Sequence, residues 1–417
     1  MQAVLKNAIA LAQAHLFVLD SHKLMQRAEL RKAVMAYLDK HHLNRRAFLK
    51  IGAAGVLAAP ALSLAADEKP AARPGYRILG RTGLEVSVVS LGAYQVKETE
   101  MMQAVFEHGA NFVDTARIYL NGKNEQQVGE AIRNFGGKVH VLTKLCGGEP
   151  KEAMEKSITD SLAALKMDCV DVLMLHKVED AKELADGPSR EVIINAKQQG
   201  KARFLGVSTH KNEAGVINAV IEDPDHLFDC VLLTYSYKSP PEVKEAIARA
   251  AQAGIGIIAM KTQMGGYSGK EFGDITPHQA ALKWVLSDVN IACAIPSMCS
   301  LKQVKEDMAV MKMIADGQGA VTPGDSAALR RYGDAIASRW CYRCGACAPT
   351  CPLGADIPVI NRCMMYAEGY NNVELARATR HRELPAFPCA DCSNCVARCP
   401  RGVDLPARTA LARNVLA

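Results

Sequence analysis

Nine of the fourteen cysteines in this chain lie between Cys341 and Cys399, and eight of them form two identical runs. Each run reads Cys-x2-Cys-x2-Cys-x3-Cys-Pro, and the candidate ligands are Cys341, Cys344, Cys347, Cys351, Cys389, Cys392, Cys395 and Cys399. The two-residue gaps let three thiolates on one turn face three corners of a cubane, and the proline ends the local helix. The repeat therefore predicts two [4Fe–4S] clusters, with structural zinc and disulfides as the alternatives.

The two runs resemble those of two-cluster ferredoxins. That resemblance implies a crossed pairing, in which the fourth cysteine of each run serves the other cluster. One site would hold Cys341, Cys344, Cys347 and Cys399, and the other Cys389, Cys392, Cys395 and Cys351. The connector 352–388 reads as partly helical, similar to helical ferredoxin domains fused to oxidoreductases. Cys363 lies outside both runs and is expected to be a buried core thiol.

Short apolar runs in the middle of the chain end at, or are followed by, a second set of side chains that could take part in catalysis. These are Asp114, Tyr119, Lys144 and His176. Reduction of a carbonyl by hydride needs a proton donor at the oxygen, and a tyrosine phenol can be that donor. A cation at Lys144 would lower the pKa of Tyr119, Asp114 would keep the lysine charged, and His176 could hold the substrate oxygen. Each residue alone has an ordinary structural explanation, but the four in order predict a catalytic site.

An alternation of strands and helices would position these four residues. The expected strands are Val88–Leu91, Asn111–Val113, Val139–Thr143, Val170–Leu175, Arg203–Val207, Cys230–Thr234, Gly256–Ala259 and Ile291–Ile295. Amphipathic helical segments separate them, which predicts an α/β fold of the (β/α)8 TIM-barrel type with catalytic groups at the C-terminal ends of the strands. A doubly wound sheet would need a phosphate loop after its first strand. The Gly-x-Gly-x-x-Ala pattern at Gly254 enters a strand and cannot supply that loop.

From about Tyr76 to about Asp316 the chain resembles an aldo–keto reductase. The sequence Asp-Thr-Ala-Arg-Ile-Tyr contains Asp114 and Tyr119, and Lys144 and His176 complete the catalytic tetrad of that family. The resemblance implies a small carbonyl or alcohol substrate and a nicotinamide cofactor.

The nicotinamide contacts that the resemblance implies are Ser208, Thr209, Met260, Lys261, Ser297 and Lys302. Several depart from the family pattern, since Thr209 replaces an amide and Met260 replaces the aromatic residue that stacks on the ring. No arginine stands where many relatives bind a 2′-phosphate, although a lysine can serve as a point charge. NADP is the family default, and NAD or no nicotinamide remain open.

The first 66 residues contain Asn-Arg-Arg-Ala-Phe-Leu-Lys, with Arg45 and Arg46, followed by a small apolar run. This pattern resembles a twin-arginine (Tat) signal peptide, which implies export of the folded protein by the Tat machinery and a periplasmic or other extracytoplasmic location. An amphipathic or membrane-anchoring helix is the alternative. Nine basic and three acidic residues in this segment account for the formal net charge of +6. The remainder is balanced, which argues against nucleic-acid binding.

The expected organisation is a leader at 1–66, a linker at 67–75, a barrel at 76–320 and a small, mainly helical, ferredoxin-like domain at 335–410. The sequence predicts an iron–sulfur oxidoreductase that interconverts a carbonyl and an alcohol with NAD(P)(H) and exchanges electrons with a one-electron partner protein. An electron-transfer subunit with the barrel as a docking scaffold is the main alternative, and a redox sensor is a third. The substrate, the reaction direction and the oligomeric state stay open.

Overall fold

The computed structural model describes residues 72–267, 276–384, 386–392 and 394–416. The predicted leader at 1–66, with its twin-arginine pattern, lies outside the described residues. Within the described ranges, no helix is both long enough and apolar enough to cross a membrane.

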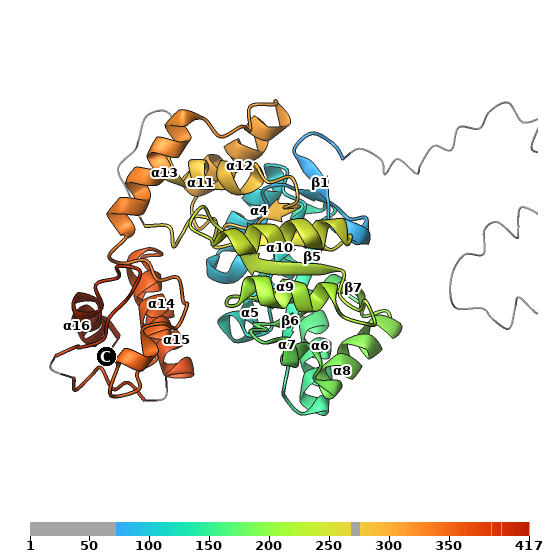
Figure 1. Ribbon diagram of the computed structural model, residues 1–417. Coiled ribbons are helices and arrows are strands. Elements are labelled where there is room, and N and C mark those ends of the chain that lie inside the picture. The colour runs from blue at the N-terminus through green and yellow to red at the C-terminus, as the bar shows by residue number, and fades with distance from the viewer. Residues whose placement is uncertain (1–71, 268–275, 385, 393, 417) are drawn as a thin grey trace, which may run out of the picture. The chain divides into compact units, whose positions relative to one another are not determined.

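Eight parallel strands occupy the middle of the chain, and each pairs with the next in sequence order (Figure 1). They are β3 (Leu91–Gly92), β4 (Phe112–Asp114), β5 (His140–Cys146), β6 (Val170–His176), β7 (Ala202–Thr209), β8 (Cys230–Thr234), β9 (Gly256–Met260) and β10 (Cys293–Ala294). A parallel bridge joins Val89 to Ala294, and the Ser90 N–H donates to the Ala294 carbonyl at 2.9 Å. The last strand therefore meets the first, which confirms the predicted (β/α)8 barrel.

All eight expected strands are present, but their lengths differ from the expectation where the barrel closes. β3 and β10 contain only two residues each, whereas β5 and β7 are longer than expected. The central strands have hydrogen-bonded partners on both sides along their length, while the closing strands meet over a single bridge.

Helices alternate with the strands and lie around them (Figure 1). They are α4 (Thr99–Glu107), α5 (Lys123–Phe135), α6 (Lys151–Leu165), α7 (Ala181–Leu184), α8 (Gly187–Gln198), α9 (Glu213–Ile221), α10 (Pro241–Gln252), α11 (Pro277–Leu286) and α12 (Leu301–Ala315). Side-chain caps begin several of them, including Thr276 before α11 and Ser300 before α12. Their buried faces and the outward faces of the strands form the main hydrophobic core.

A short antiparallel hairpin, β1 (Tyr76–Ile78) and β2 (Glu85–Ser87), precedes the barrel. Its buried residues Leu79, Leu84 and Val86 pack in one cluster with inward-facing strand residues such as Phe112 and Leu142. The hairpin therefore packs against the inside of the barrel, which leaves the carboxyl ends of the strands to form a site.

After α12 the chain forms α13 (Pro323–Ile336), which packs on α11 through a buried ion pair between Lys283 and Asp325 at 2.6 Å. The C-terminal module, residues 340–416, then contains α14 (Ile357–Glu368), α15 (Val373–Glu383) and α16 (Leu405–Leu416). It has its own hydrophobic core, in which Cys363 is fully buried as expected. The module is mainly helical, as predicted.

Candidate active site

The four predicted catalytic residues lie together at the carboxyl ends of consecutive strands. Asp114 ends β4, Lys144 lies in β5, His176 ends β6, and Tyr119 begins the 3₁₀ turn η3 (Tyr119–Gly122) after β4. Lys144 Nζ pairs with the Asp114 carboxylate, donates to the Thr115 carbonyl at 2.8 Å and donates to the Tyr119 hydroxyl at 3.3 Å. The rings of Tyr119 and His176 meet edge to face, with centroids 5.8 Å apart. The structure thus brings all four residues, hereafter the tetrad, into one buried group.

Burial governs the ionisation of the tetrad. Burial raises the pKa of Tyr119 well above its usual range, and the charge of Asp114 raises it further. The expected lowering of the Tyr119 pKa is not found, because burial and the Asp114 charge outweigh any effect of Lys144. Burial and the Lys144 charge also hold the pKa of His176 well below its usual range. Tyr119 is therefore a phenol and His176 a neutral imidazole near neutral pH.

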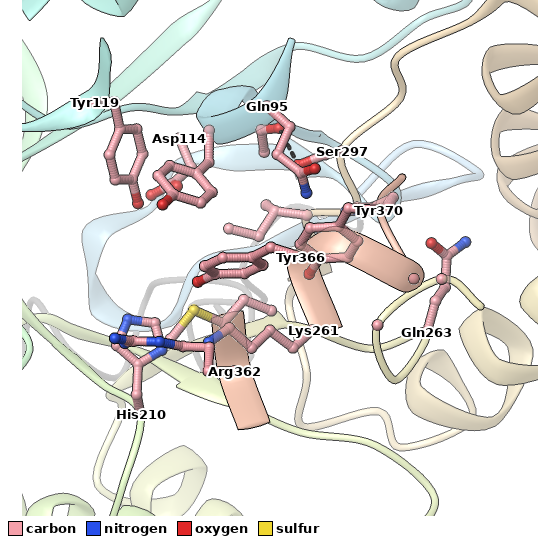
Figure 2. Close-up of a pocket in the computed structure, with 18 of the residues that line it drawn as sticks. Gln95, Asp114, Tyr119, His210, Lys261, Gln263, Ser297, Arg362, Tyr366 and Tyr370 are labelled. Carbon is pink, nitrogen blue, oxygen red and sulfur yellow. Dashed lines mark hydrogen bonds between the residues drawn. The ribbon is translucent and has the colours of Figure 1, made fainter. Parts of the chain in front are cut away.

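The tetrad opens into a cavity of about 590 Å³, hereafter the tetrad cavity, whose walls come from both the barrel and the C-terminal module (Figure 2). Residues of the module that line it include Arg362, Tyr366, Tyr370, Arg382 and Glu383. The sequence analysis missed these residues. Their only signal is the spacing of four between Arg362, Tyr366 and Tyr370, which places them on one face of a helix and its continuation.

The six predicted nicotinamide contacts divide into two groups. Met260, Lys261 and Ser297 line the tetrad cavity, whereas the other three do not. The Ser208 hydroxyl accepts from the Lys177 N–H at 3.0 Å and Thr209 donates to the Lys211 carbonyl at 2.7 Å, so local backbone occupies both hydroxyls. Lys302 is exposed on α12.

One carboxylate in the tetrad cavity, that of Glu383, forms ion pairs with three basic side chains. Glu383 pairs with Lys177 at 3.2 Å, with Arg382 at 3.2 Å and with the buried Arg362. Although burial opposes ionisation, these charges lower the pKa of Glu383 to about 2, with Arg362 contributing most. Lys177 belongs to the barrel and the other three to the module, so this ion network ties the two together.

The eight cysteines of the two runs form two groups of neighbours. The thiols of Cys347, Cys399 and Cys344 all raise the pKa of Cys341, which burial raises most, to about 11. In the same way, burial raises the pKa of Cys389 to about 11, and its neighbours Cys395, Cys351 and Cys392 raise it further. The fourth cysteine of each run therefore lies with the other run, in the arrangement that the ferredoxin resemblance implies.

The surroundings of these thiols suit a cluster. A small cavity of about 50 Å³ is lined by Cys351, Cys389, Cys392 and Cys395 together with mostly apolar side chains such as Leu353 and Ile357. In the other group, the Arg343 N–H donates to the Cys341 sulfur at 3.3 Å, which favours a thiolate. Among the described residues, no three Cys, His, Asp or Glu side chains are arranged to hold a single metal ion.

A second cavity, of about 230 Å³ and hereafter the module cavity, joins the cysteine module to the tetrad. It is lined by Cys341 and Cys344, and it shares His210, Lys261 and Arg362 with the tetrad cavity. The cavity that borders the first cysteine group and the cavity that borders the tetrad therefore share part of their walls.

Comparisons with known proteins agree with this division of the chain. Residues 92–273 match the model of the aldo/keto reductase family, and residues 340–403 match that of the 4Fe-4S dicluster domain. The middle of the chain is therefore similar to aldo/keto reductases, and its C-terminal part is similar to 4Fe-4S dicluster domains.

The curated relatives match over only part of their length. A probable voltage-gated potassium channel subunit beta of Arabidopsis thaliana is 38% identical over 24% of this chain and 37% of its own. An uncharacterized oxidoreductase of Bacillus subtilis is 31% identical over 32% of this chain and 48% of its own.

Solved structures show the same fold. An aldo-keto reductase from Bacillus halodurans in its holo form aligns with a TM-score of 0.52 and 21% identity, over 62% of this chain and 96% of its own. An aldo-keto reductase from Klebsiella pneumoniae in complex with NADPH aligns with a TM-score of 0.51 and 22% identity, over 61% of this chain and 94% of its own. At this identity the likeness establishes the barrel fold alone.

Proposed function

We propose that this chain is an iron–sulfur oxidoreductase that interconverts a carbonyl and an alcohol with NAD(P)(H). In this proposal two [4Fe–4S] clusters exchange electrons with a one-electron partner protein. The observation that carries the proposal is that the cavity at the complete tetrad shares wall residues with the cavity at the first cysteine group. An enzyme that couples carbonyl chemistry to iron–sulfur centres needs those two sites to be close.

The tetrad residues have separate tasks in this reaction. Tyr119 donates its proton to the carbonyl oxygen as charge develops there, and the high pKa of the phenol keeps that proton in place until then. The Lys144 ammonium, 3.3 Å from the phenol oxygen, stabilises the phenolate left behind, and Asp114 orients the lysine. His176, neutral and beside Tyr119, can donate a hydrogen bond that directs the substrate oxygen.

A nicotinamide would supply or accept the hydride at the substrate carbon. The residues present fit such a group in part, because the cavity continues from the tetrad past Met260 to Ser297 and Gln303. Met260 would pack against the ring and Ser297 would lie farther along the same cavity. No arginine from α12 lines this cavity, so a 2′-phosphate would have weak support and NAD is as acceptable as NADP.

The two cysteine groups would hold the clusters, which supply one-electron transfer. The hydride that reduces the carbonyl leaves an oxidised nicotinamide, and two electrons from the partner protein through the two clusters, with one proton, would reduce it again once per turnover. The shared wall of the two cavities contains His210, whose carbonyl oxygen accepts from Arg343 of the module at 3.3 Å. In this proposal electrons pass between the first cysteine group and the tetrad cavity through the wall that the two cavities share.

Anaerobic purification with iron, sulfide and nucleotide analysis tests the cofactor content directly. Tyr119→Phe should abolish turnover of a carbonyl substrate and leave the cluster spectra unchanged. Tyr370→Phe is the matched control, since the Tyr370 ring also lines the cavity and its hydroxyl makes no hydrogen bond to a described residue. Unchanged turnover in Tyr119→Phe would instead favour an electron-transfer subunit whose barrel is a scaffold.

Export through the Tat pathway is part of the same proposal, and it rests on the sequence around Arg45 and Arg46. Tat transport accepts folded cargo, which suits a protein that must bind its clusters before export. Replacement of both arginines by lysine should retain the protein in the cytoplasm, as measured by cell fractionation. Equal amounts of periplasmic protein from the variant and the wild type would contradict this location.

A further inference from the structure

Lys261 places an amino group in the tetrad cavity without an ion pair to any described residue. It follows the last residue of β9, and its backbone has a φ of +55°, in the left-handed region that L-residues seldom adopt. Among the residues that the structure describes, its amino group has no hydrogen bond or ion pair, although its side chain lines both cavities. Burial lowers the pKa of Lys261 strongly, Arg343, Arg362 and Lys177 lower it further, and Glu213 of the module cavity opposes this only in part. The residues of the cavity therefore favour the neutral amine, and a bound anion would favour its protonation.

The charges around Lys261 do not balance within the described part of the cavity. The acidic groups Asp114 and Glu368 are each paired with a cation behind the wall, Lys144 and Arg408 respectively. Glu383 is then the remaining carboxylate, and it already serves three cations. The cavity lining therefore has a surplus of positive charge that a bound anion would neutralise.

Three buried nitrogen atoms in the same lining also have no hydrogen-bond partner among the residues that the structure describes. They are Nδ1 of His176, Nδ1 of His210 and Nε of Arg362. Only about 6% of Arg362 is exposed, and an unsatisfied donor so deeply buried is costly. A ligand with acceptor oxygens would satisfy such donors.

The rest of the cavity is aromatic, and the tetrad lies across it from the cations. Tyr366 and Tyr370 stack with centroids 5.3 Å apart, and Tyr94 lies against Tyr119 at 4.6 Å. Figure 2 shows Lys261 and Arg362 on one side of Tyr366, with Tyr119 and its neighbours on the other. A ligand that spans the cavity would therefore present an anionic end, an apolar body and a group at the tetrad.

We propose that the tetrad cavity binds an oxo acid, whose carboxylate pairs with Lys261 and Arg362 while its carbonyl reaches Tyr119. The C-terminal module thus contributes substrate specificity through Arg362, in addition to its cysteines. This inference rests on the proposed carbonyl chemistry for the role of Tyr119. The binding of the carboxylate is measured without turnover, so the two can fail separately.

The test is calorimetric titration of the anaerobically purified full chain with 4-acetylbenzoate, whose carboxylate and carbonyl stand at opposite ends of an aromatic ring, and with its uncharged methyl ester. The acid should bind about tenfold or more tightly than the ester, as expected for charge-assisted hydrogen bonds in a buried site. Lys261→Met should weaken acid binding about 10- to 100-fold and leave ester binding unchanged, whereas Lys261→Arg should retain acid binding. Lys312→Met removes an exposed lysine of α12 and is the matched control, with no expected change.

Lys261 forms no ion pair with a described residue, so its loss should leave the fold intact, and cluster absorbance and circular dichroism check this. Equal binding of acid and ester by the wild type would overturn the proposal. So would a Lys261→Met variant that loses affinity for NADPH and not for the acid, because the cations would then belong to the dinucleotide phosphates. A Tyr119→Phe variant with normal carbonyl turnover would refute the proposed reaction while leaving the acid-binding result valid.

Discussion

Replacement of Lys144 by methionine should destabilise the barrel in a pH-dependent way. Only 2% of Lys144 and 3% of Asp114 are exposed, and one oxygen of Asp114 has no hydrogen bond apart from this ion pair. Without the lysine, Asp114 is a buried carboxylate with no counter-ion, so it takes up a proton. Burial already raises the pKa of Asp114 in the wild type, and the loss of the cation raises it further.

The cost of this protonation can be estimated. Neutralising a carboxyl whose unfolded pKa is about 3.9 requires about 4 kcal/mol at pH 7, which sets an upper limit on the loss of unfolding free energy. Because the pKa of Asp114 in the folded variant lies above its pKa in the unfolded chain, the loss of unfolding free energy exists above the unfolded pKa. This loss becomes smaller as the pH falls toward the unfolded pKa. The penalty should decrease by about 1.4 kcal/mol for each pH unit, so the variant should be less impaired at pH 6 than at pH 7.

The second buried lysine–aspartate pair provides a matched control. Asp325 pairs with Lys283 at 2.6 Å and also accepts from the backbone N–H and the hydroxyl of Thr322, at 2.7 and 2.8 Å. In Lys283→Met those two hydrogen bonds remain and continue to favour the carboxylate. This variant should therefore lose less stability than Lys144→Met and show a weaker dependence on pH.

The assay is urea unfolding of the anaerobic protein at pH 6, 7 and 8, followed by the fluorescence of Trp284 on α11. The chain has two tryptophans, so a Trp340→Phe background leaves Trp284 as the reporter of the barrel. The double variant Lys144→Met, Asp114→Asn should recover stability, since it contains no buried charge. Equal losses of unfolding free energy in Lys144→Met and Lys283→Met would refute this reasoning. A loss in Lys144→Met that does not change with pH would also refute it.

Three further outcomes are expected. Gly369→Ala should loosen the packing of the module on the barrel, because an added Cβ would collide with the Gly265 carbonyl oxygen; faster hydrogen exchange in the loop after β9 would show it. Cys399→Ser should change the electron paramagnetic resonance signal that Cys341→Ser also changes, as crossed pairing requires, and different affected signals would contradict that pairing. Glu383→Gln should lower the unfolding free energy by about 2 kcal/mol at neutral pH, because solvent screens part of an ion-pair energy of about 3 kcal/mol. In the wild type, the contribution of Glu383 to the unfolding free energy should be lost as the pH falls from about 4.5 toward 2, as measured by urea unfolding.

The tetrad and the cysteine groups were predictable from the sequence because each depends on local spacing. Asp114, Lys144 and His176 each stand at the end of an apolar run, and parallel strands bring their carboxyl ends to one face of a barrel. The pKa of Tyr119 was not predictable, since its direction depends on how deeply neighbouring elements bury the phenol. For the same reason, Ser208 could not be known to lie outside the cavity with its hydroxyl occupied by the Lys177 backbone.

The sequence by itself determined the two kinds of chemistry that this protein contains: a barrel with a complete tetrad and eight cysteines in two repeated runs. Both follow from hydrophobic periodicity and from ligand spacing over a few residues. Only the tertiary structure decided that the cations of α14 and α15, together with Tyr366 and Tyr370, line the same cavity as the tetrad. Arg362 and Lys177 are far apart in sequence, and only the packing of the module on the barrel brings them to one carboxylate.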